Sequence, residues 1–301
     1  MTSADLLAFE TLRPRLFAIA YRMLGMRADA EDVVQDAWLR FSTSAHDDIR
    51  SAEAWLVTIT TRLSIDRLRS RKNEREAYTG WWLPEPVVEM VDDTPETVAE
   101  LASDVSVAML WVLERLTPEE RAAFLMRKVF DQDYGELAAM LGKSESACRQ
   151  LVHRAQERIR QERPRFTVSK NMHRLVLEKF MRAAANADRD AMKTLLAADV
   201  EFRADGGGKV PSLHKVLVGT GRVAGLYWAV ENAFRNRVAY RMARVNGEPG
   251  LVRYIEGKVE SVQSFCIEDG RISRIDVVRN PDKLRGIPPM PSAGTNAIAG
   301  A

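Results

Sequence analysis

The chain has 301 residues, which is enough for two or three domains of ordinary size, and its net charge of +2 favours no particular partner. Its four histidines are scattered without metal-ligand spacing, and no apolar run is long enough to span a membrane. With no signal-peptide pattern and two distant cysteines that suit free thiols, the sequence predicts a cytoplasmic protein without a metal or cofactor.

The first block, residues 1 to 76, carries apolar side chains at helical spacing that Gly25 interrupts. A helix over Asp29–Arg40 begins with acidic residues, and this is the helix end that favours negative charge. Its exposed face, opposite the apolar positions, holds Asp32, Gln35 and Asp36. From the pattern alone, that face is an ordinary solvated one.

A further helix is predicted from Ala52 to Arg75. Trp55 and Leu56 begin its apolar stripe, and from Arg62 onward it carries six basic residues against two acids, a local charge of about +4. Such a run is often only a solvated helix end. Because a second basic helix occurs later in the chain, contact with nucleic-acid phosphates is the favoured interpretation.

An acidic segment follows. Residues 76 to 110 contain eight acidic residues and neither Lys nor Arg. Pro84 and Pro86 exclude a regular helix, and the apolar string Trp81-Trp82-Leu83 comes directly before them. Acidic, proline-bearing segments are usually solvated linkers. Adjacent aromatic side chains are unusual in such a linker, so we predict that this string docks on another surface.

Capping signals mark the helices after the linker. An apolar helix is predicted over Val105–Leu116, and Thr117 with Glu120 begins the next helix through a capping box. Asp133 and Glu136 repeat the same spacing at the start of a shorter helix. These elements predict a small helical domain.

The shorter helix is the first half of a helix-turn-helix. Gly142 accepts the left-handed conformation that closes a helix, and Ser144 can cap the basic helix that follows. In a DNA major groove, Arg and Gln on such a helix contact base edges, and further Arg hold phosphates. The ordinary alternative is an amphipathic helix pair with a solvated basic face. The candidate DNA-binding residues are Ser144, Ser146, Arg149, Gln150, His153, Arg154 and Arg158.

Two helices open the C-terminal part of the chain. They are predicted over Met172–Ala187, with Leu175 and Phe180 inside, and over Asp190–Ala198. Strands follow, and two pairs of them flank Asn246-Gly247 and Asp269-Gly270, dipeptides that suit tight turns with positive φ. Helices followed by hairpins predict an α+β cone with a curved antiparallel sheet.

Two features of this cone are candidates for catalysis or ligand binding. The acid–base candidates are Asp205, His214, Tyr227 and Asp276, but no paired arrangement is visible, so no catalytic residue is predicted. The glycine run at 205–209 before Lys209 could cradle a phosphate through backbone N–H groups. It lacks the spacing of a P-loop, and a flexible turn between strands is the ordinary alternative.

The blocks at 30–40 and 54–69, followed by the helix-turn-helix, resemble an extracytoplasmic-function (ECF) sigma factor over residues 5 to 163. The resemblance implies a multidomain chain that begins with two all-α sigma domains. Its implied parts are region 2 at 1–76, the acidic linker at 77–104 and region 4 at 105–163.

The same resemblance implies a partner for each set of candidate residues. The protein partner would be core RNA polymerase, through its β′ clamp helices and β flap, and the nucleic-acid partner would be promoter DNA. The residues facing the clamp helices would be Asp32, Gln35 and Asp36. The residues that hold and melt the −10 element would be Trp55, Arg62, Arg67 and Arg69. The −35 element would be read by the helix from Ser144 to Arg158.

Three strings further resemble a subgroup with a fused C-terminal SnoaL-like domain of NTF2-like fold, here 170–284, ahead of a disordered tail at 285–301. They are Trp-Leu-Pro-Glu-Pro in the linker, Asp-Gly-Gly-Gly-Lys and Asn-Pro-Asp-Lys-Leu. The family implication is an intramolecular regulator in place of a separate anti-sigma protein. The implied regulatory contacts are Trp81, Trp82, Leu83, Pro84, Asp205, Gly206, Gly207, Gly208, Lys209, Asn280, Pro281, Asp282, Lys283 and Leu284.

We therefore expect a sigma factor whose third domain docks on region 2 and on the linker, with room for an unidentified small ligand in the cone. Two alternatives stay open. One is a ligand-responsive helix-turn-helix regulator that does not need core polymerase. The other is a sigma factor whose C-terminal domain has enzyme activity on a small molecule.

Overall fold

The computed structural model describes residues 3–44, 49, 51–71, 77–90, 106–162 and 169–290. The chain divides into two compact units, of which unit 1 comprises Met1–Ala77 and Glu96–Arg163, and unit 2 comprises Tyr78–Pro95 and Pro164–Ala301. The described part of the acidic linker thus belongs to the same unit as the C-terminal domain. Among the described residues, no helix has the length and apolar character needed to cross a membrane.

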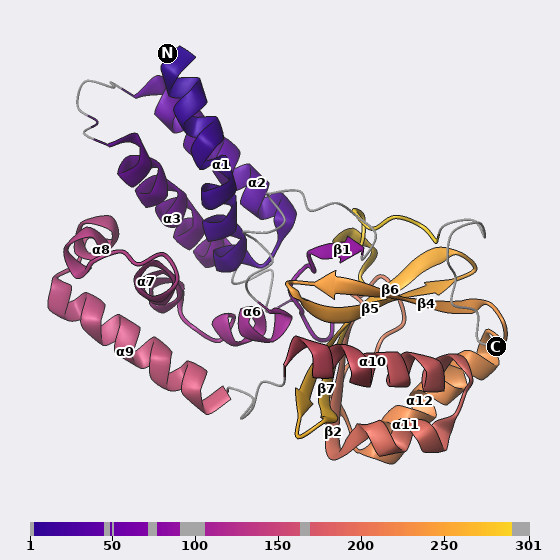
Figure 1. Ribbon diagram of the computed structural model, residues 1–301. Helices are drawn as coiled ribbons and strands as arrows, with labels where there is room; N and C mark the ends of the chain where they lie inside the picture. The colour runs from indigo at the N-terminus through magenta and orange to yellow at the C-terminus, as the bar shows by residue number, and fades with distance from the viewer. Residues whose placement is uncertain are drawn as a thin grey trace. The chain divides into compact units, whose positions relative to one another are not determined.

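The N-terminal helices of unit 1 pack against one another (Figure 1). They are α1 (Ser3–Leu24), α2 (Arg27–Thr43) and α3 (Ala52–Ser70). Gly25 lies between α1 and α2 with a φ of +68°, a value that only glycine adopts without strain. The predicted break at this position is therefore confirmed.

Four more helices follow among the described residues of unit 1: α6 (Val107–Leu113), α7 (Pro118–Lys128), α8 (Tyr134–Leu141) and α9 (Glu145–Glu162). Both predicted capping boxes are present, at Thr117 with Glu120 and at Asp133 with Glu136. Each box satisfies backbone N–H groups that the first helical turn leaves without partners. These helix starts were therefore predicted correctly.

The later helices of unit 1 pack on the first three. Contacts join α7 to α1 and α3, and α8 to α3. Buried Arg121 of α7 donates to the backbone oxygen of Met23 and, at 2.8 Å, to Glu114. The guanidinium of Arg22 lies 5.2 Å from the centre of the Phe130 ring. The two predicted all-α domains therefore share a packed interface inside one unit.

Unit 2 is a seven-stranded sheet with helices on one side (Figure 1). The strands, in the order in which they pair, are β1 (Val88–Met90), β4 (Val238–Val245), β5 (Glu248–Ile255), β6 (Lys258–Glu268), β7 (Arg271–Val278), β2 (Leu196–Asp205) and β3 (Leu217–Val218). The helices are α10 (Lys170–Ala185), α11 (Arg189–Leu195) and α12 (Thr220–Ala233). Buried aromatic residues, among them Phe180, Tyr227 and Phe265, fill the core between helices and sheet.

The predicted α+β cone and both hairpins are confirmed. Asn246 and Asp269 each have a φ of +50° and are followed by glycines with positive φ. The sheet is not wholly antiparallel, however, because β2 pairs with β7 in parallel. The predicted helix at 190–198 is too long, because Leu196 already begins β2.

Two further expectations are wrong. Leu175 is 53% exposed, since the buried face of α10 passes through its neighbours Val176 and Leu177 instead. Disorder does not begin after Leu284, because the backbone N–H of Met290 donates to the carbonyl of Gly257 at 3.0 Å. Residues 291–301 of the expected tail lie outside the described residues.

Candidate functional site

The helix-turn-helix consists of α8 and α9 joined at Gly142, whose φ of +62° lies in the left-handed region. Ser144 caps α9 by accepting a hydrogen bond from the N–H of Ala147 at 3.2 Å. One face of α9 is buried against its neighbours, with Cys148 and Ala155 fully covered. The local sequence therefore sets the turn, and the buried stripe sets which face of α9 points outward.

The outward face holds the predicted DNA-binding set. All of its members are exposed: Ser144, Ser146, Arg149, Gln150, His153, Arg154 and Arg158. Arg149 donates to Glu145 at 2.8 Å and lies 4.6 Å from the Tyr134 ring centre, which orients its side chain at the start of α9. The N-terminal residues of a recognition helix are those that contact base edges.

Two members of this set have a partner in α7, outside the helix-turn-helix. Arg154 donates through Nε and Arg158 through Nη1 to the carboxylate of Glu120, at 3.2 and 2.7 Å. Glu120 lies in α7 and is almost fully buried. The sequence pattern indicates only a capping role for Glu120, because nothing local in the sequence connects it to α9.

The predicted −10 residues lie along α3, but they are not all free. Arg62 donates through Nε to the carbonyl of Met140 at 2.8 Å and through Nη2 to that of Ala139 at 3.0 Å. Arg69 pairs with Glu119, and this hydrogen bond lowers the pKa of the Glu119 carboxyl. These arginines therefore join region 2 to the helices of region 4.

The other two predicted −10 residues have partners within the first three helices. Arg67 donates to the buried carboxylate of Asp29 at 3.1 Å. Trp55 is half-buried, with its ring centre 5.6 Å from that of Phe41. On α2, Asp32, Gln35 and Asp36 are exposed as expected, and their side chains form no hydrogen bond to another described residue.

A second candidate site lies inside unit 2, where residues 78–83, 205–209 and 279–284 meet; we call it the junction. Its centre is Asp205, which is fully buried. One carboxylate oxygen accepts from the hydroxyl of Tyr78 at 2.6 Å and the N–H of Gly207 at 3.0 Å. The other accepts from the N–H of Leu83 at 2.9 Å and the ammonium of Lys283 at 2.7 Å. Asp205 therefore joins all three segments.

Lys283 and Asn280 complete the junction. The buried ammonium of Lys283 also donates to the carbonyl of Leu83 and lies 4.2 Å from the Trp82 ring centre. Asn280 donates to the Tyr78 hydroxyl at 3.0 Å. Burial, together with the hydrogen bond to Asp205, raises the pKa of Tyr78, so its phenol stays a neutral donor.

The glycine run is required by how closely the segments approach. At Gly207, with a φ of +62°, a Cβ atom would lie 2.5 Å from the side-chain carbon of Asn280. At Gly208, with a φ of +69°, a Cβ atom would lie 3.3 Å from the Cβ of Thr79 in the linker. Any larger residue would therefore displace the C-terminal segment or the linker.

The glycine run does not form a phosphate cradle. The N–H of Gly207 is bonded to Asp205, and the N–H groups of Lys209 and Val210 are directed at the carbonyl of Gly206. The ammonium of Lys209 pairs with Asp282. Three backbone N–H groups of the run and the Lys209 ammonium are thus already used by partners within unit 2.

The linker continues from the junction along the edge of the sheet. Val87 exchanges two hydrogen bonds with Asn246, and β1 then pairs antiparallel with β4. Closer to the junction, the Trp81 ring centre lies 5.4 Å from the guanidinium carbon of Arg203. Pro84 and Leu284 are buried. Residues 78–90 of the linker therefore contact the C-terminal domain within unit 2.

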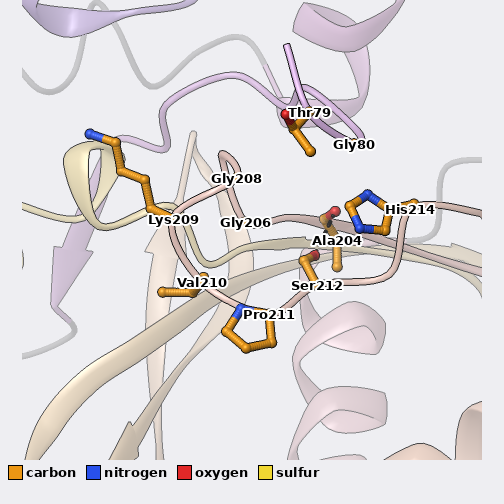
Figure 2. A pocket seen from close by; sticks show the side chains of 10 residues that line it. All are labelled: Thr79, Gly80, Ala204, Gly206, Gly208, Lys209, Val210, Pro211, Ser212 and His214. Carbon is orange, nitrogen blue, oxygen red and sulfur yellow. Dashed lines mark hydrogen bonds between the residues drawn. The ribbon is translucent and has the colours of Figure 1, made fainter.

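A cavity of about 540 Å³ lies beside the junction (Figure 2). Thr79 and Gly80 of the linker line it, with Ala204, Gly206, Gly208, Lys209, Val210, Pro211, Ser212 and His214. No acidic side chain lines it. One space open to a small molecule therefore lies at the linker, and apolar side chains pack between the helices and the sheet of the cone.

The four acid–base candidates have separate roles. Asp205 holds the linker, Asp276 pairs with Arg274 at 3.0 Å, and the hydroxyl of buried Tyr227 donates to Gln263 at 2.7 Å. His214 is exposed on the loop after β2. No two of these candidates are joined by a hydrogen bond in the described part of the chain.

Comparison with known proteins covers both units. Family models match Sigma-70 region 2 over residues 8–74 and Sigma-70 region 4 over residues 107–159. The ECF RNA polymerase sigma factor SigJ of Mycobacterium tuberculosis is 37% identical over 93% of both chains. A probable ECF sigma factor of that species, SigI, is 31% identical over 92% of this chain and 93% of its own. The crystal structure of M. tuberculosis SigJ aligns with a TM-score of 0.76 at 34% identity, covering 94% of this chain and 99% of that one.

Proposed function

The chain belongs to the ECF RNA polymerase sigma factors, with regions 2 and 4 for core binding and promoter recognition, and we propose that docking of its linker at the junction regulates this activity. The alternative of a helix-turn-helix regulator without core polymerase is set aside, because both regions and the full-length relatives are those of sigma factors. The observation that carries the regulatory proposal is Asp205, whose carboxylate joins the linker to the C-terminal segment.

Within this function we propose a partner for each face of unit 1. The exposed polar face of α2 would contact the β′ clamp helices, and region 4 would contact the β flap. Trp55, with the basic residues of α3, would bind the −10 element. The N-terminal part of α9 would read the −35 element, because its polar residues are exposed and properly oriented by the turn.

The distance between the two promoter elements indicates whether docking of the linker raises or lowers transcription. Elements at −10 and −35 lie about 25 base pairs apart, roughly 85 Å of B-DNA. Regions 2 and 4 are packed together, with Arg62 of α3 bonded to α8. They must therefore separate to contact both elements at once. Residues 78–90 held on unit 2 shorten the free chain between the two regions, so docking should oppose separation and limit transcription.

The cavity beside the linker is where we propose that a small ligand would act. A molecule seated there would contact Thr79 and Gly80 together with the loop after β2. Its binding free energy would add to that of linker docking. Such a ligand would lower transcription. Catalysis by this domain is not part of the proposal, because Asp205, Tyr227 and Asp276 are bonded to separate structural partners and none of them is joined to His214.

Truncation with core polymerase tests the proposal. A chain that ends at Arg279 lacks Asn280 and Lys283, and we expect it to give more promoter-dependent transcript than the full chain. A chain that ends at residue 165 removes the domain on which the linker docks, so its activity should also differ. Equal transcription by all three chains would contradict regulation by the junction. Pull-down of core polymerase by each chain separates this outcome from loss of sigma function.

A further inference from the structure

Glu120 occupies an unusual place between two helices. Its carboxylate closes the capping box of α7 by accepting from the N–H of Thr117 at 3.1 Å. The same carboxylate accepts from Arg154 Nε and Arg158 Nη1 of the recognition helix. Its side chain is only 4% exposed, whereas those of the arginines are 56% and 48% exposed. One buried acid therefore holds two half-exposed cations.

The two arginines lie one helical turn apart on α9, beside the face that carries Gln150 and His153. Each guanidinium has five N–H donors, and Glu120 uses one donor of each. The other donors of each guanidinium are not used by Glu120, and about half of each arginine side chain is exposed. Glu120 balances only one of the two positive charges. The cluster of Glu120, Arg154 and Arg158 therefore keeps a net positive charge beside the face of α9 that carries Gln150 and His153.

We propose that Glu120 is a positioning residue for DNA binding: it orients Arg154 and Arg158 so that their remaining donors hold backbone phosphates flanking the −35 element. This inference rests on the proposed reading of that element by α9. Phosphate contacts fix the register of a protein on DNA, while base contacts supply specificity. Glu120 should thus control affinity without choosing the sequence.

The Glu120 carboxylate also repels DNA phosphates, but this repulsion lowers the affinity for DNA less than the orientation of the arginines raises it. In water, a negative charge about 7 Å from a phosphate has a repulsion close to RT, a factor of about three in affinity. Burial of Glu120 strengthens this repulsion, but the two guanidinium groups that it holds carry twice its charge and offset it. Ordering a long arginine side chain costs up to about tenfold in affinity for each residue. Orientation of two arginines therefore outweighs the repulsion from Glu120.

The variant that tests the inference is Glu120→Gln in the full chain, because Gln keeps the size of Glu and also suits the capping box. The probe is a duplex with a −35 sequence that the wild-type chain selects from a random pool. We expect binding about tenfold weaker and a salt dependence shallower by up to about 1.8, since each lost phosphate contact removes about 0.9 from the slope. The ratio of specific to nonspecific affinity should change little.

The matched control is Glu136→Gln, which alters the equivalent capping residue of α8 but has no arginine partner among the described residues. It should leave the salt slope unchanged. If Glu120→Gln unfolds region 4, the pair Arg154→Gln and Arg158→Gln tests the same phosphate contacts with Glu120 intact, and should lower the slope by about 1.8. Tighter binding with a steeper slope for Glu120→Gln, or an unchanged slope in both variants, would overturn the inference. Promoter recognition by α9 that persists in these variants would leave the proposed function intact.

Discussion

At the scale of single residues, the junction depends on one buried ion pair. Asp205→Asn removes the negative charge and leaves the Lys283 ammonium buried among aromatic rings. Breaking such a pair from one side costs about 3–5 kcal/mol. We expect the linker to leave the sheet, and the amide of Leu83, which donates to Asp205, to exchange with deuterium much faster than in the wild-type chain.

A control for Asp205→Asn is an acidic residue of the 279–284 segment, which also contains Lys283. Asp282→Asn breaks the pairs with Lys209 and Arg285, whose side chains are 54% and 79% exposed. Solvated ion pairs contribute below about 1 kcal/mol, so exchange at Leu83 should change little. Equal protection of Leu83 in Asp205→Asn and in wild type would show that the buried pair does not hold the linker.

A buried histidine predicts how unit 2 responds to acid. Burial lowers the pKa of His173 to about 4, against about 6.5 in an unfolded chain. The folded state therefore prefers neutral His173. Its contribution is fully present above about pH 6.5 and is lost as the pH falls toward 4, by up to about 3 kcal/mol. Hydrogen exchange of α10 between pH 7 and 4.5 measures this loss.

The matched variants for this prediction replace the two histidines of unit 2, one in each variant. His173→Leu cannot titrate, so its α10 amides should show a smaller loss of protection in acid than those of wild type. His214→Leu changes an exposed histidine and should follow the wild-type curve. Identical pH dependence in all three chains would mean that another group controls acid stability.

Residue roles were predictable where they depend on near neighbours in sequence. The capping boxes at Thr117 and Asp133 involve residues three positions apart, so composition and spacing are sufficient. The partners of Asp205 include Tyr78, 127 positions away, and no local pattern encodes that distance. The family strings marked Asp205 and Lys283 as regulatory, but Tyr78 and Glu120 carried no signal of their long-range partners.

At the scale of elements, the loop after β2 should tolerate little change. Gly207→Ala places a methyl group against Asn280 in a left-handed backbone conformation, which alone costs about 1–2 kcal/mol. We expect the 280–284 segment to lose its contacts and its amide protection. Gly221→Ala, near the start of α12, is the control, because nothing lies within 4 Å of its added methyl group. Unchanged protection in Gly207→Ala would contradict the close approach.

Elements were predictable when their pattern was long and bounded by turns. The β4 and β7 strands carry alternating side chains beside Asn-Gly or Asp-Gly turns, so their positions followed from sequence. β1 has only three residues and forms because its backbone pairs with the edge of β4. Such pairing needs a distant strand, and the prolines nearby indicated an irregular linker. The sequence therefore predicted that the linker docks, but not that it adds a strand.

At the scale of the whole molecule, the proposed regulation has two sets of contacts that would oppose promoter recognition. Arg62 and Arg69 join α3 to the helices of region 4, so region 2 has fewer free cations for DNA while the regions are packed. Separately, the junction holds the linker that connects these regions. The expected docking of the third domain on region 2 stays a prediction. Release of the linker should favour separation of regions 2 and 4, which frees the arginines of α3.

The most direct test of this account is promoter-dependent transcription in vitro by core polymerase with saturating amounts of wild-type chain, Asp205→Asn or Asp282→Asn. Both variants lose one negative charge, but only the first breaks the buried pair that holds the linker. The account predicts more transcript with Asp205→Asn and a wild-type amount with Asp282→Asn. Equal transcript from all three chains, or less from Asp205→Asn while it still binds core polymerase, would contradict control of the sigma factor by its docked linker.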